Sequence, residues 1–503
     1  MRRKLLGLLV ATMALAPAAC TPVRNPATGQ VQYTSLTPEQ EKQLGRQEHP
    51  KALAEFGGQY ANPKLQAYVE RVGNRVKNAS ELKGEPFTFT VLDSDIVNAF
   101  ALPGGYIYIT RGLLALANDE AEVAGVLGHE IGHVTARHTA QRYDKAQQGQ
   151  LGAVAAQIGG MLLGGYLGGT EGARMGGQLG GQAGSLGAQA YVQGYSREQE
   201  FEADQLGVRY LGGAGYDPGA MASFLKALNA NDALQQREAG RGGEEESALA
   251  GWFRSHPRTP ERIERAAQAV SAELPQARAT DRQPFLAAID GMIYGEDPAQ
   301  GFVRGRSFQH PGLRIAFEAP TGFRLQNTPE AVIGTDGQGR FMTFDMAKSG
   351  AGDLRAYLQR EWVPNQELQD LQSLTVSGQP AAVGFGRVSV SGRPAMAMFS
   401  AVRGADGNVY RLLYAKSAQF TQADVAAFEQ SLRSFRPLSA AEAAKLQPTR
   451  VRLVTVKPGD TIDTFTRQME VEQDPRGLFV LLNGLDRGRS LEPGDQVKVL
   501  KRG

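Results

Sequence analysis

The chain has 503 residues, of which 42% are hydrophobic and 21% are charged. This composition is typical of globular proteins and excludes a chain that is disordered throughout. The formal net charge is only +2, which argues against a nucleic-acid binder that works through bulk positive charge. The single cysteine, Cys20, excludes an intrachain disulfide and a metal site built from several cysteines. At about 150 residues per domain, the length predicts two to four domains.

The first twenty residues have the composition of an export signal. Basic residues at positions 2–4 precede an uncharged run from Leu5 to Ala16, and small residues lead up to Cys20. At about 1.5 Å per residue, this run is too short to span a hydrocarbon core of about 30 Å. The segment resembles the acylation site of a bacterial lipoprotein, although Pro17 stands where leucine is usual. Thr21 then implies outer-membrane sorting, and a plain secretory signal is the alternative.

The next region is predicted to be mainly helical. Residues 21–36 are polar and contain proline, which suits a tether, and residues 37–300 are predicted to form one mainly α domain with a small sheet. The predicted strands are Thr88 to Leu92 and Gly105 to Thr110. Within this domain, residues 151–190 contain 14 glycines and only two charges. Small-residue helices packed against protein are favoured there, and a membrane-dipping hairpin is the alternative.

The strongest chemical signal is His129-Glu130-Ile131-Gly132-His133. Asp119 and Glu122 upstream have a spacing typical of a helix start, so this motif is predicted to lie on a helix. Histidines at i and i+4 share a helix face and can both bind one Zn²⁺. Glu130 would then take a proton from the water that the metal polarises. Two core histidines on a buried helix are the alternative.

A third metal ligand must come from elsewhere in the chain. His138 lies nine residues after His129, which on a continuing helix is about 900° and therefore the opposite face, so a surface or packing role is expected. The acidic run from Ser196 to Asp204 is the better candidate. Glu200 and Asp204 share a helix face. Glu200 is therefore a possible zinc ligand, and Asp204 could hydrogen-bond one of the ligand imidazoles. We choose His129 as that imidazole. Spacing alone also allows Glu198 with Glu202, or a solvated acidic face.

These motifs together resemble the gluzincin metallopeptidases related to the CAAX prenyl endopeptidase. Within that group they are similar to the periplasmic branch, the beta-barrel assembly-enhancing protease type. The resemblance covers about residues 35–270 and assigns the third zinc ligand to Glu200. It is carried by the HEIGH motif and by four further stretches: Ser196 to Asp204, Asn98 to Tyr106, Gly215 to Pro218, and Ser255 to Ile263.

The resemblance also implies how substrate is bound. In this family an edge strand beside the active-site helix takes up substrate by β-addition, and Tyr106 to Thr110 is the expected strand. Asn98, Gly105, Tyr106 and Tyr108 are therefore the expected substrate-binding residues. In periplasmic relatives a histidine in a loop comparable to that of His256 can occupy the open zinc position and hold the enzyme inactive. Stabilising the oxyanion and making structural hydrogen bonds are the alternatives for His256.

The carboxyl-terminal part is predicted to form two further domains. Short strand-like runs and two helical stretches predict an α+β domain at residues 301–440, followed by a linker. Residues 451–503 resemble a LysM module, a small βααβ unit that binds glycan. The supporting stretches are Val454 to Thr461, Leu481 to Gly484, and Leu491 to Val499.

The sequence therefore predicts an outer-membrane-anchored zinc endopeptidase on the periplasmic side of the envelope, with one Zn²⁺ per chain. Its expected partners are misfolded or misassembled envelope proteins, the membrane through a lipid on Cys20, and peptidoglycan; nucleic acid is not expected. The alternatives are a zinc-containing chaperone or assembly factor, and a peptidoglycan-binding scaffold with little proteolysis.

Overall fold

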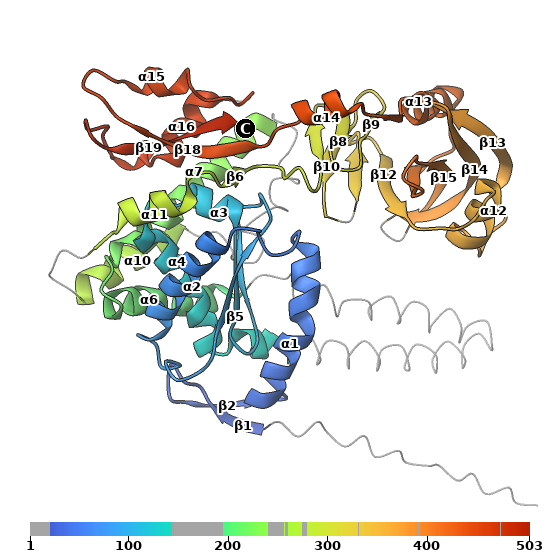
Figure 1. Cartoon of the computed structure of the whole chain (residues 1–503). Helices are drawn as coiled ribbons and strands as arrows, with labels where there is room; N and C mark the ends of the chain where they lie inside the picture. The colour runs from blue at the N-terminus through green and yellow to red at the C-terminus, as the bar shows by residue number, and fades with distance from the viewer. Residues whose placement is uncertain are drawn as a thin grey trace, which may run out of the picture.

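The structure is a computed structural model that describes most of the chain (Figure 1). The predicted signal with Cys20 and the glycine-rich segment 151–190 lie outside the described residues. No helix among the described residues is long and apolar enough to cross a membrane. The described residues are 21–142, 144, 195–239, 256, 260–273, 279–329, 331–390, 393–472 and 474–503.

The segment predicted as a tether is instead folded against the protein. Strands β1 (Thr21–Arg24) and β2 (Val31–Thr34) form an antiparallel hairpin. The side-chain amide of Asn25, which is buried in the turn, donates a hydrogen bond to the carbonyl of Ala136 at 3.2 Å. Because Asn25 also accepts hydrogen bonds from its own turn, polar residues that looked suited to a tether stabilise a docked hairpin.

The region that follows is mainly helical, as predicted. Its core contains helix α4, in which all but one residue is buried, so it lies at the centre of the other helices. The elements are α1 (Pro38–Glu55), α2 (Pro63–Lys77), β3 (Thr88–Leu92), β4 (Ala99–Leu102), β5 (Tyr106–Thr110), α3 (Arg111–Leu116), α4 (Glu120–Thr135), α6 (Arg197–Gly213), α7 (Gly219–Ala239), α10 (Pro260–Glu273) and α11 (Arg282–Ile289).

The small sheet in this region has the order β3-β5-β4, which corrects one prediction. Strand β5, expected at the edge, is the middle strand: it runs parallel to β3 and antiparallel to β4. Strand β4 is the edge that packs against α4. The sequence Ala-Phe-Ala-Leu is a short apolar run without polar alternation, so its strand character was not recognised.

Helix α4 begins where the sequence predicted. Asp119 is its N-cap, and the Asp119 carboxylate accepts a hydrogen bond from the backbone amide of Glu122 at 2.9 Å. The carboxylate of Glu122 accepts a hydrogen bond from the backbone amide of Asn118 at 2.8 Å, one residue before the N-cap. These contacts satisfy amide groups at the start of the helix and fix where the histidine motif begins.

The middle of the chain is rich in sheet (Figure 1). An antiparallel sheet has the order β10-β11-β12-β16-β15-β14-β13, and separate apolar clusters contain its side chains. Its strands are β10 (Arg324–Asn327), β11 (Val332–Thr335), β12 (Arg340–Ala347), β13 (Gln369–Val376), β14 (Gln379–Val390), β15 (Arg393–Arg403) and β16 (Val409–Lys416). A smaller sheet contains β7 (Phe302–Arg304), β8 (Ser307–His310), β9 (Ile315–Glu318) and β17 (Arg436–Pro437), and the helices are α12 (Leu354–Tyr357), α13 (Gln422–Arg433) and α14 (Ala440–Lys445).

The last part of the chain returns to the helical region (Figure 1). We call residues 449–503 the C-terminal module; its elements are β18 (Thr449–Thr455), α15 (Ile462–Thr466), α16 (Pro475–Leu482), a 3-10 turn (Leu485–Arg487) and β19 (Gln496–Arg502). Strand β18 pairs with β19 and also with β6 (Ile293–Tyr294), which follows α11. A single cluster of buried apolar side chains includes Val126 of α4 and Phe479 of α16. The likeness to LysM itself stays a prediction.

Candidate metal centre

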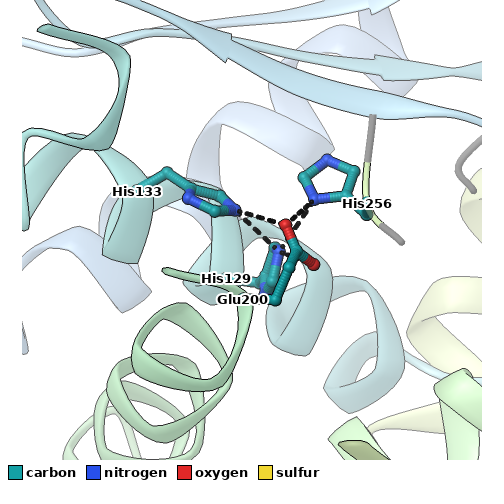
Figure 2. A group of neighbouring side chains, drawn as sticks. All are labelled: His129, His133, Glu200 and His256. Atoms are coloured by element: carbon teal, nitrogen blue, oxygen red, sulfur yellow. Dashed lines mark hydrogen bonds and ion pairs between the residues drawn. The ribbon is translucent and has the colours of Figure 1, made fainter. Parts of the chain in front are cut away.

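Four buried side chains converge on one point between α4 and α6 (Figure 2). His129 and His133 come from α4, Glu200 comes from α6, and His256 comes from the chain before α10. Each offers a ligand atom, and these atoms all lie within 4.8 Å of one another. None of the four residues is more than 1% exposed. The three predicted zinc ligands are thus brought together, and His256 joins them.

Small residues allow the two helices to approach closely enough for this convergence. Gly128 and Gly132 of α4 face Gly207 and Ala203 of α6. A Cβ atom on Gly132 would lie 3.1 Å from the carbonyl oxygen of Ala203, which is tighter than an ordinary contact. Because the backbones are this close, the carboxylate of Glu200 reaches the imidazoles of α4.

The spacing of the donor atoms suits a divalent metal. The Nε2 atoms of His129 and His133 lie 3.0 Å apart, and they lie 3.7 Å and 3.5 Å from carboxylate oxygens of Glu200. Tetrahedral zinc with bonds of about 2.0–2.1 Å separates its ligand atoms by about 3.3 Å. Two imidazoles and one carboxylate are also a ligand set found in catalytic zinc sites. The residues therefore fit the metal that the sequence predicts.

His129 is held by a carboxylate and an arginine. Its Nδ1 atom lies 2.9 Å from the carboxylate of Asp204. The sequence analysis had chosen His129 as the imidazole that Asp204 supports. Arg262 of α10 donates two hydrogen bonds to that carboxylate, both at 2.8 Å, and its third nitrogen lies 2.6 Å from Glu200. Arg262 thus fixes both acidic residues. The sequence analysis had quoted the stretch Ser255 to Ile263, which contains Arg262, without giving Arg262 a role.

His133 is held by a second chain of polar contacts that includes His138. The Nδ1 atoms of the two histidines lie 2.9 Å apart, and the Nε2 atom of His138 lies 3.1 Å from Glu202. The expected position of His138 on the opposite face was wrong, because α4 ends at Thr135 and Arg137 adopts a left-handed conformation with φ of 59°. The chain turns back there, so His138 is buried beside His133.

Glu130 and His256 lie next to each other beside the ligand set. Both carboxylate oxygens of Glu130 are buried and accept no hydrogen bond from any residue that the structure describes. The Nε2 atom of His256 lies 3.4 Å from Glu130, and its Nδ1 atom lies 2.9 Å from Glu200 and 3.2 Å from His129. His256 therefore bridges the predicted base and the predicted ligands.

Burial and neighbouring charges shift the pKa values at this centre. Burial lowers the pKa of His133 well below its usual value, so its ring is neutral and retains a lone pair for a metal. Burial raises the pKa of the Glu130 carboxyl. Burial also opposes ionisation of Glu200, but the charges of His256 and Arg262 outweigh it and hold that pKa well below its usual value. A neutral imidazole and an ionised carboxylate are the forms that bind metal.

Two of the predicted substrate-binding residues, Tyr106 and Tyr108, lie against His49 of α1. Tyr108 is fully buried, and its hydroxyl lies 2.7 Å from His49 of α1, so it does not line an exposed strand edge. Tyr106 is half-buried and also lies against His49. Asn98, directly before β4, has a buried side-chain oxygen with no hydrogen-bond partner among the described residues. Of this set, Asn98 is the residue with an unused polar group.

Comparisons with known proteins agree with this geometry. Residues 63–270 match the model of peptidase family M48. The chain is 35% identical over 228 residues to a Vibrio cholerae protein provisionally named a beta-barrel assembly-enhancing protease, covering 45% of this chain and 46% of that protein. It is 28% identical over 232 residues to the beta-barrel assembly-enhancing protease of Escherichia coli, with the same coverage. It is 31% identical over 190 residues to the mitochondrial metalloendopeptidase OMA1 of Arabidopsis thaliana, covering 38% of this chain and 33% of that protein.

The match to the family model ends at residue 270, before the sheet-rich middle and the C-terminal module. The chain spans less than half the length of these relatives. The matched segment contains α4, α6 and His256, and hence every residue of the metal centre. The match to peptidase family M48 is therefore a match of residues 63–270, the segment that contains the metal centre.

Proposed function

We propose that this chain is a zinc-dependent endopeptidase that hydrolyses peptide bonds of misfolded or misassembled proteins of the cell envelope. One observation carries the proposal: His129, His133 and Glu200 converge in a buried site beside the carboxylate of Glu130. The match of this segment to peptidase family M48 supports it.

The residues of the site have distinct proposed roles. His129, His133 and Glu200 hold one Zn²⁺, which when bound polarises a water molecule and a peptide carbonyl. Glu130 takes a proton from the attacking water and returns it to the leaving amine. Burial raises the pKa of Glu130, which makes its carboxylate a stronger base, and neither of its oxygens accepts a hydrogen bond from the described residues; both observations support this role.

His256 is proposed to gate the site. Its Nδ1 atom belongs to the same cluster of donor atoms as the three ligands, which supports metal binding by His256 in a closed state. A fourth protein ligand would occupy the position that a catalytic zinc site keeps open for water or substrate. Cleavage then requires His256 to leave, after which it could stabilise the oxyanion.

Substrate is proposed to add to β4 rather than to β5. Strand β4 pairs only with β5 among the described strands and packs against α4, so its outer edge faces no partner strand in that part of the chain. An extended peptide added there would run alongside the helix that carries the metal ligands. The side-chain oxygen of Asn98 has no hydrogen-bond partner among the described residues; because it is buried, it would accept a hydrogen bond from a substrate amide only after a local rearrangement.

The location and further partners are also proposals. The export signal and Cys20 support a lipid-anchored protein on the periplasmic side of the outer membrane, and the names of the bacterial relatives refer to β-barrel assembly. The anchor is tested by comparing the native chain with Cys20→Ser in membrane fractions and by labelling with a radioactive fatty acid. Peptidoglycan binding by the C-terminal module is tested by sedimentation of the full chain with purified cell wall.

A chaperone or assembly factor with little proteolysis is the second candidate. It is favoured by the same position of His256, because a site closed by a fourth ligand is inactive until it opens. The two candidates differ in whether chemistry at Glu130 is needed in the cell.

The test uses a soluble form of the mature chain, residues 21–503, which lacks Cys20, with the variants Glu130→Gln and His256→Ala. We expect one zinc per chain by metal analysis in all three proteins. Casein cleavage should fall by about 10²–10⁴-fold in Glu130→Gln, the usual contribution of a general base. It should rise in His256→Ala. His310→Ala is the matched control, because His310 lies in β8, outside the metal centre.

The outcomes separate the candidates. Absence of zinc in the mature chain contradicts the catalytic assignment. Zinc without cleavage in any variant, together with cellular function retained by Glu130→Gln, favours the chaperone. Unchanged cleavage in His256→Ala contradicts only the proposed gating role of His256 and leaves the peptidase assignment in place.

A further inference from the structure

Two cations of the C-terminal module reach into the segment where the active-site helix begins. Lys498 of β19 is fully buried, and its Nζ donates hydrogen bonds to the carbonyls of Ala115 at 2.7 Å and Ala117 at 2.6 Å. These carbonyls belong to the last turn of α3 and to its C-cap. Because the C-terminal end of a helix carries partial negative charge, the ammonium group stabilises this end.

Arg487 makes the second contact, and it reaches α4 itself. Its side chain is 9% exposed and donates a hydrogen bond to the carboxylate of Glu122 at 2.7 Å. It also donates to the carbonyl of Ser223 on α7 at 3.1 Å. The hydroxyl of Ser223 donates to the same oxygen of Glu122 at 2.6 Å. One carboxylate on the first turn of α4 is thus held by the C-terminal module and by α7 together.

These contacts lie in line with the metal ligands. Glu122 precedes His129 by seven residues, which is close to two full helix turns, so the two side chains lie on the same face of α4. At about 1.5 Å per residue they are about 10 Å apart along the helix axis. A shift or rotation of the first turn of α4 would therefore be passed directly to His129 and His133.

Burying these cations is costly, which indicates that the interface is specific. Burial and the neighbouring charge of Arg282 lower the pKa of Lys498 well below its usual value. Arg282 itself donates to the backbone carbonyl of Asn118 and, at 3.2 Å, to that of Gln496 in β19. A buried cation that lost its hydrogen-bond acceptors would destabilise the fold. The arrangement in which the C-terminal module satisfies these cations is therefore favoured over other placements of the module.

The module is also held on the helical region by backbone pairing. Strand β18 pairs with β6, with Arg450 opposite Ile293. Asn483, one of the residues that carried the likeness to a glycan-binding module, is fully buried and bonds both backbone groups of Lys498, at 2.7 Å and 2.9 Å. Its side chain therefore supports the strand that presents Lys498.

We propose that the C-terminal module is a structural part of the peptidase, and that Arg487 and Lys498 are positioning residues that align α4 and its two zinc ligands. The proposal rests on the metal site assigned under the proposed function. It predicts that the module affects metal binding and turnover without touching substrate.

The test uses the full mature chain, because deletion of the module would expose the apolar cluster that it shares with α4. The variants are Arg487→Ala, Arg487→Lys and Lys498→Met. The matched control is Arg489→Ala, since Arg489 pairs with Asp495 inside the module at 3.3 Å. Zinc retention is measured by competition with a chelator, and hydrogen exchange of the metal-free protein is followed in peptides that cover residues 115–128.

We expect Arg487→Ala and Lys498→Met to hold zinc more weakly than the parent, by up to about 10-fold, the lower end of the effect of losing a group bonded directly to a metal ligand. Amide exchange at residues 115–128 should be faster than in the parent, and kcat should fall while KM changes little. Arg487→Lys should recover most of the loss, because its ammonium group can still reach Glu122. Arg489→Ala should behave as the parent.

The proposal is overturned if both disruptive variants retain zinc and exchange amides within twofold of the parent. If Arg487→Ala does not fold, Lys498→Met and the partial recovery in Arg487→Lys decide the question by the same two measurements. Failure of the parent chain to bind zinc would overturn the proposed function instead, whereas tight zinc binding in the parent, with unchanged zinc binding and amide exchange in both variants, overturns only this inference.

Discussion

The Nδ1 atom of His133 lies 2.9 Å from the Nδ1 atom of His138. Only one of two facing nitrogens can carry a proton if they share a hydrogen bond. When the Nε2 atom of His133 faces a metal, its Nδ1 atom must be the donor, so His138 accepts there. The proton of His138 then lies on Nε2, which faces Glu202 at 3.1 Å. Glu202 therefore selects, through His138, the ring form of His133 that binds metal.

Replacing His138 should weaken zinc binding without removing a ligand. We expect His138→Ala to bind zinc about 10-fold more weakly, because the orientation and ring form of His133 are no longer fixed. Glu202→Gln should have a smaller effect, since its amide oxygen can still accept the hydrogen bond. Competition with a chelator measures both. Equal zinc affinity in His138→Ala and the parent would contradict this role.

Arg262 should be essential for folding of the site. Arg262→Met leaves the carboxylates of Glu200 and Asp204 buried without their cation, and breaking a buried ion pair in this way costs about 3–5 kcal/mol. Arg262→Lys should rescue little, because one ammonium group cannot replace the planar fork.

Thermal unfolding of the metal-free protein measures this loss. Arg265→Met on the same helix is the control; Arg265 is exposed over the ring of Phe201, a contact worth about 0.5–1 kcal/mol. A similar decrease in Tm for the two variants would show that the buried ion pairs of Arg262 contribute no more to stability than the exposed contact of Arg265.

The parts of the site that follow from local periodicity were predictable from the sequence. The start of α4 at Asp119, the shared face of His129 and His133, and the pairing of Asp204 with His129 all depend on helix spacing over a few turns. The sheet-rich character of the middle region was also predictable, because its strands are short and separated by turn residues.

The remaining features depend on contacts that spacing does not encode. Arg137 ends α4 in a left-handed conformation without a glycine or proline to indicate it, so His138 was assigned to the wrong face. The order of the small sheet depends on how β3, β5 and β4 meet in space. Lys498 meets Ala115 across 383 positions of sequence, a distance over which no periodic pattern extends.

Asp119 should make stability depend on pH. Burial, and then the nearby charge of Glu122, raise the pKa of Asp119 to about 7, and Arg282 and Arg487 oppose this only in part. Between pH about 4 and 7 the folded state therefore binds more protons than the unfolded state, so the stability from this group falls as pH rises.

Asp119→Asn removes this titration and keeps an oxygen for the helix cap. A shift of about 3 units corresponds to about 4 kcal/mol, so we expect the variant to be more stable than the parent by up to about 4 kcal/mol at pH 8 and equal to it below pH about 4. Denaturant unfolding at several pH values tests this. Asp119→Ala, which loses the cap, should be less stable than Asp119→Asn at every pH; parallel profiles for Asp119→Asn and the parent would contradict the assignment.

The correction of the sheet order leads to a test of substrate binding. Asn98→Ala should raise KM for a peptide substrate, because Asn98 directly precedes the edge strand β4 and its side-chain oxygen has no hydrogen-bond partner among the described residues. Tyr108→Phe should change KM less than twofold, since its hydroxyl contacts His49 inside the protein. Steady-state kinetics of the His256→Ala background, in which the site is open, separates the two. A larger effect of Tyr108→Phe would favour substrate addition near β5.

The close approach of α4 and α6 should be sensitive to one methyl group. In Gly132→Ala the new Cβ would lie 3.1 Å from the carbonyl of Ala203 and 3.2 Å from the Cβ of Leu206, neither of which is the end of a flexible chain. Overpacking of this kind costs about 1–3 kcal/mol, and because it separates the helices it should also weaken zinc binding. Gly125→Ala on the same helix is the control, because its nearest contacts are at 3.5 Å.

In Gly125→Ala the gain in helix propensity, about 0.5–1 kcal/mol, should dominate and raise Tm. Opposite signs for the two alanine variants, together with a loss of zinc affinity only in Gly132→Ala, would show that the distance between α4 and α6 controls the ligand set. If both variants are stabilised and bind zinc equally, the helices can adjust, and Glu200 must reach the histidines by another means than tight helix packing.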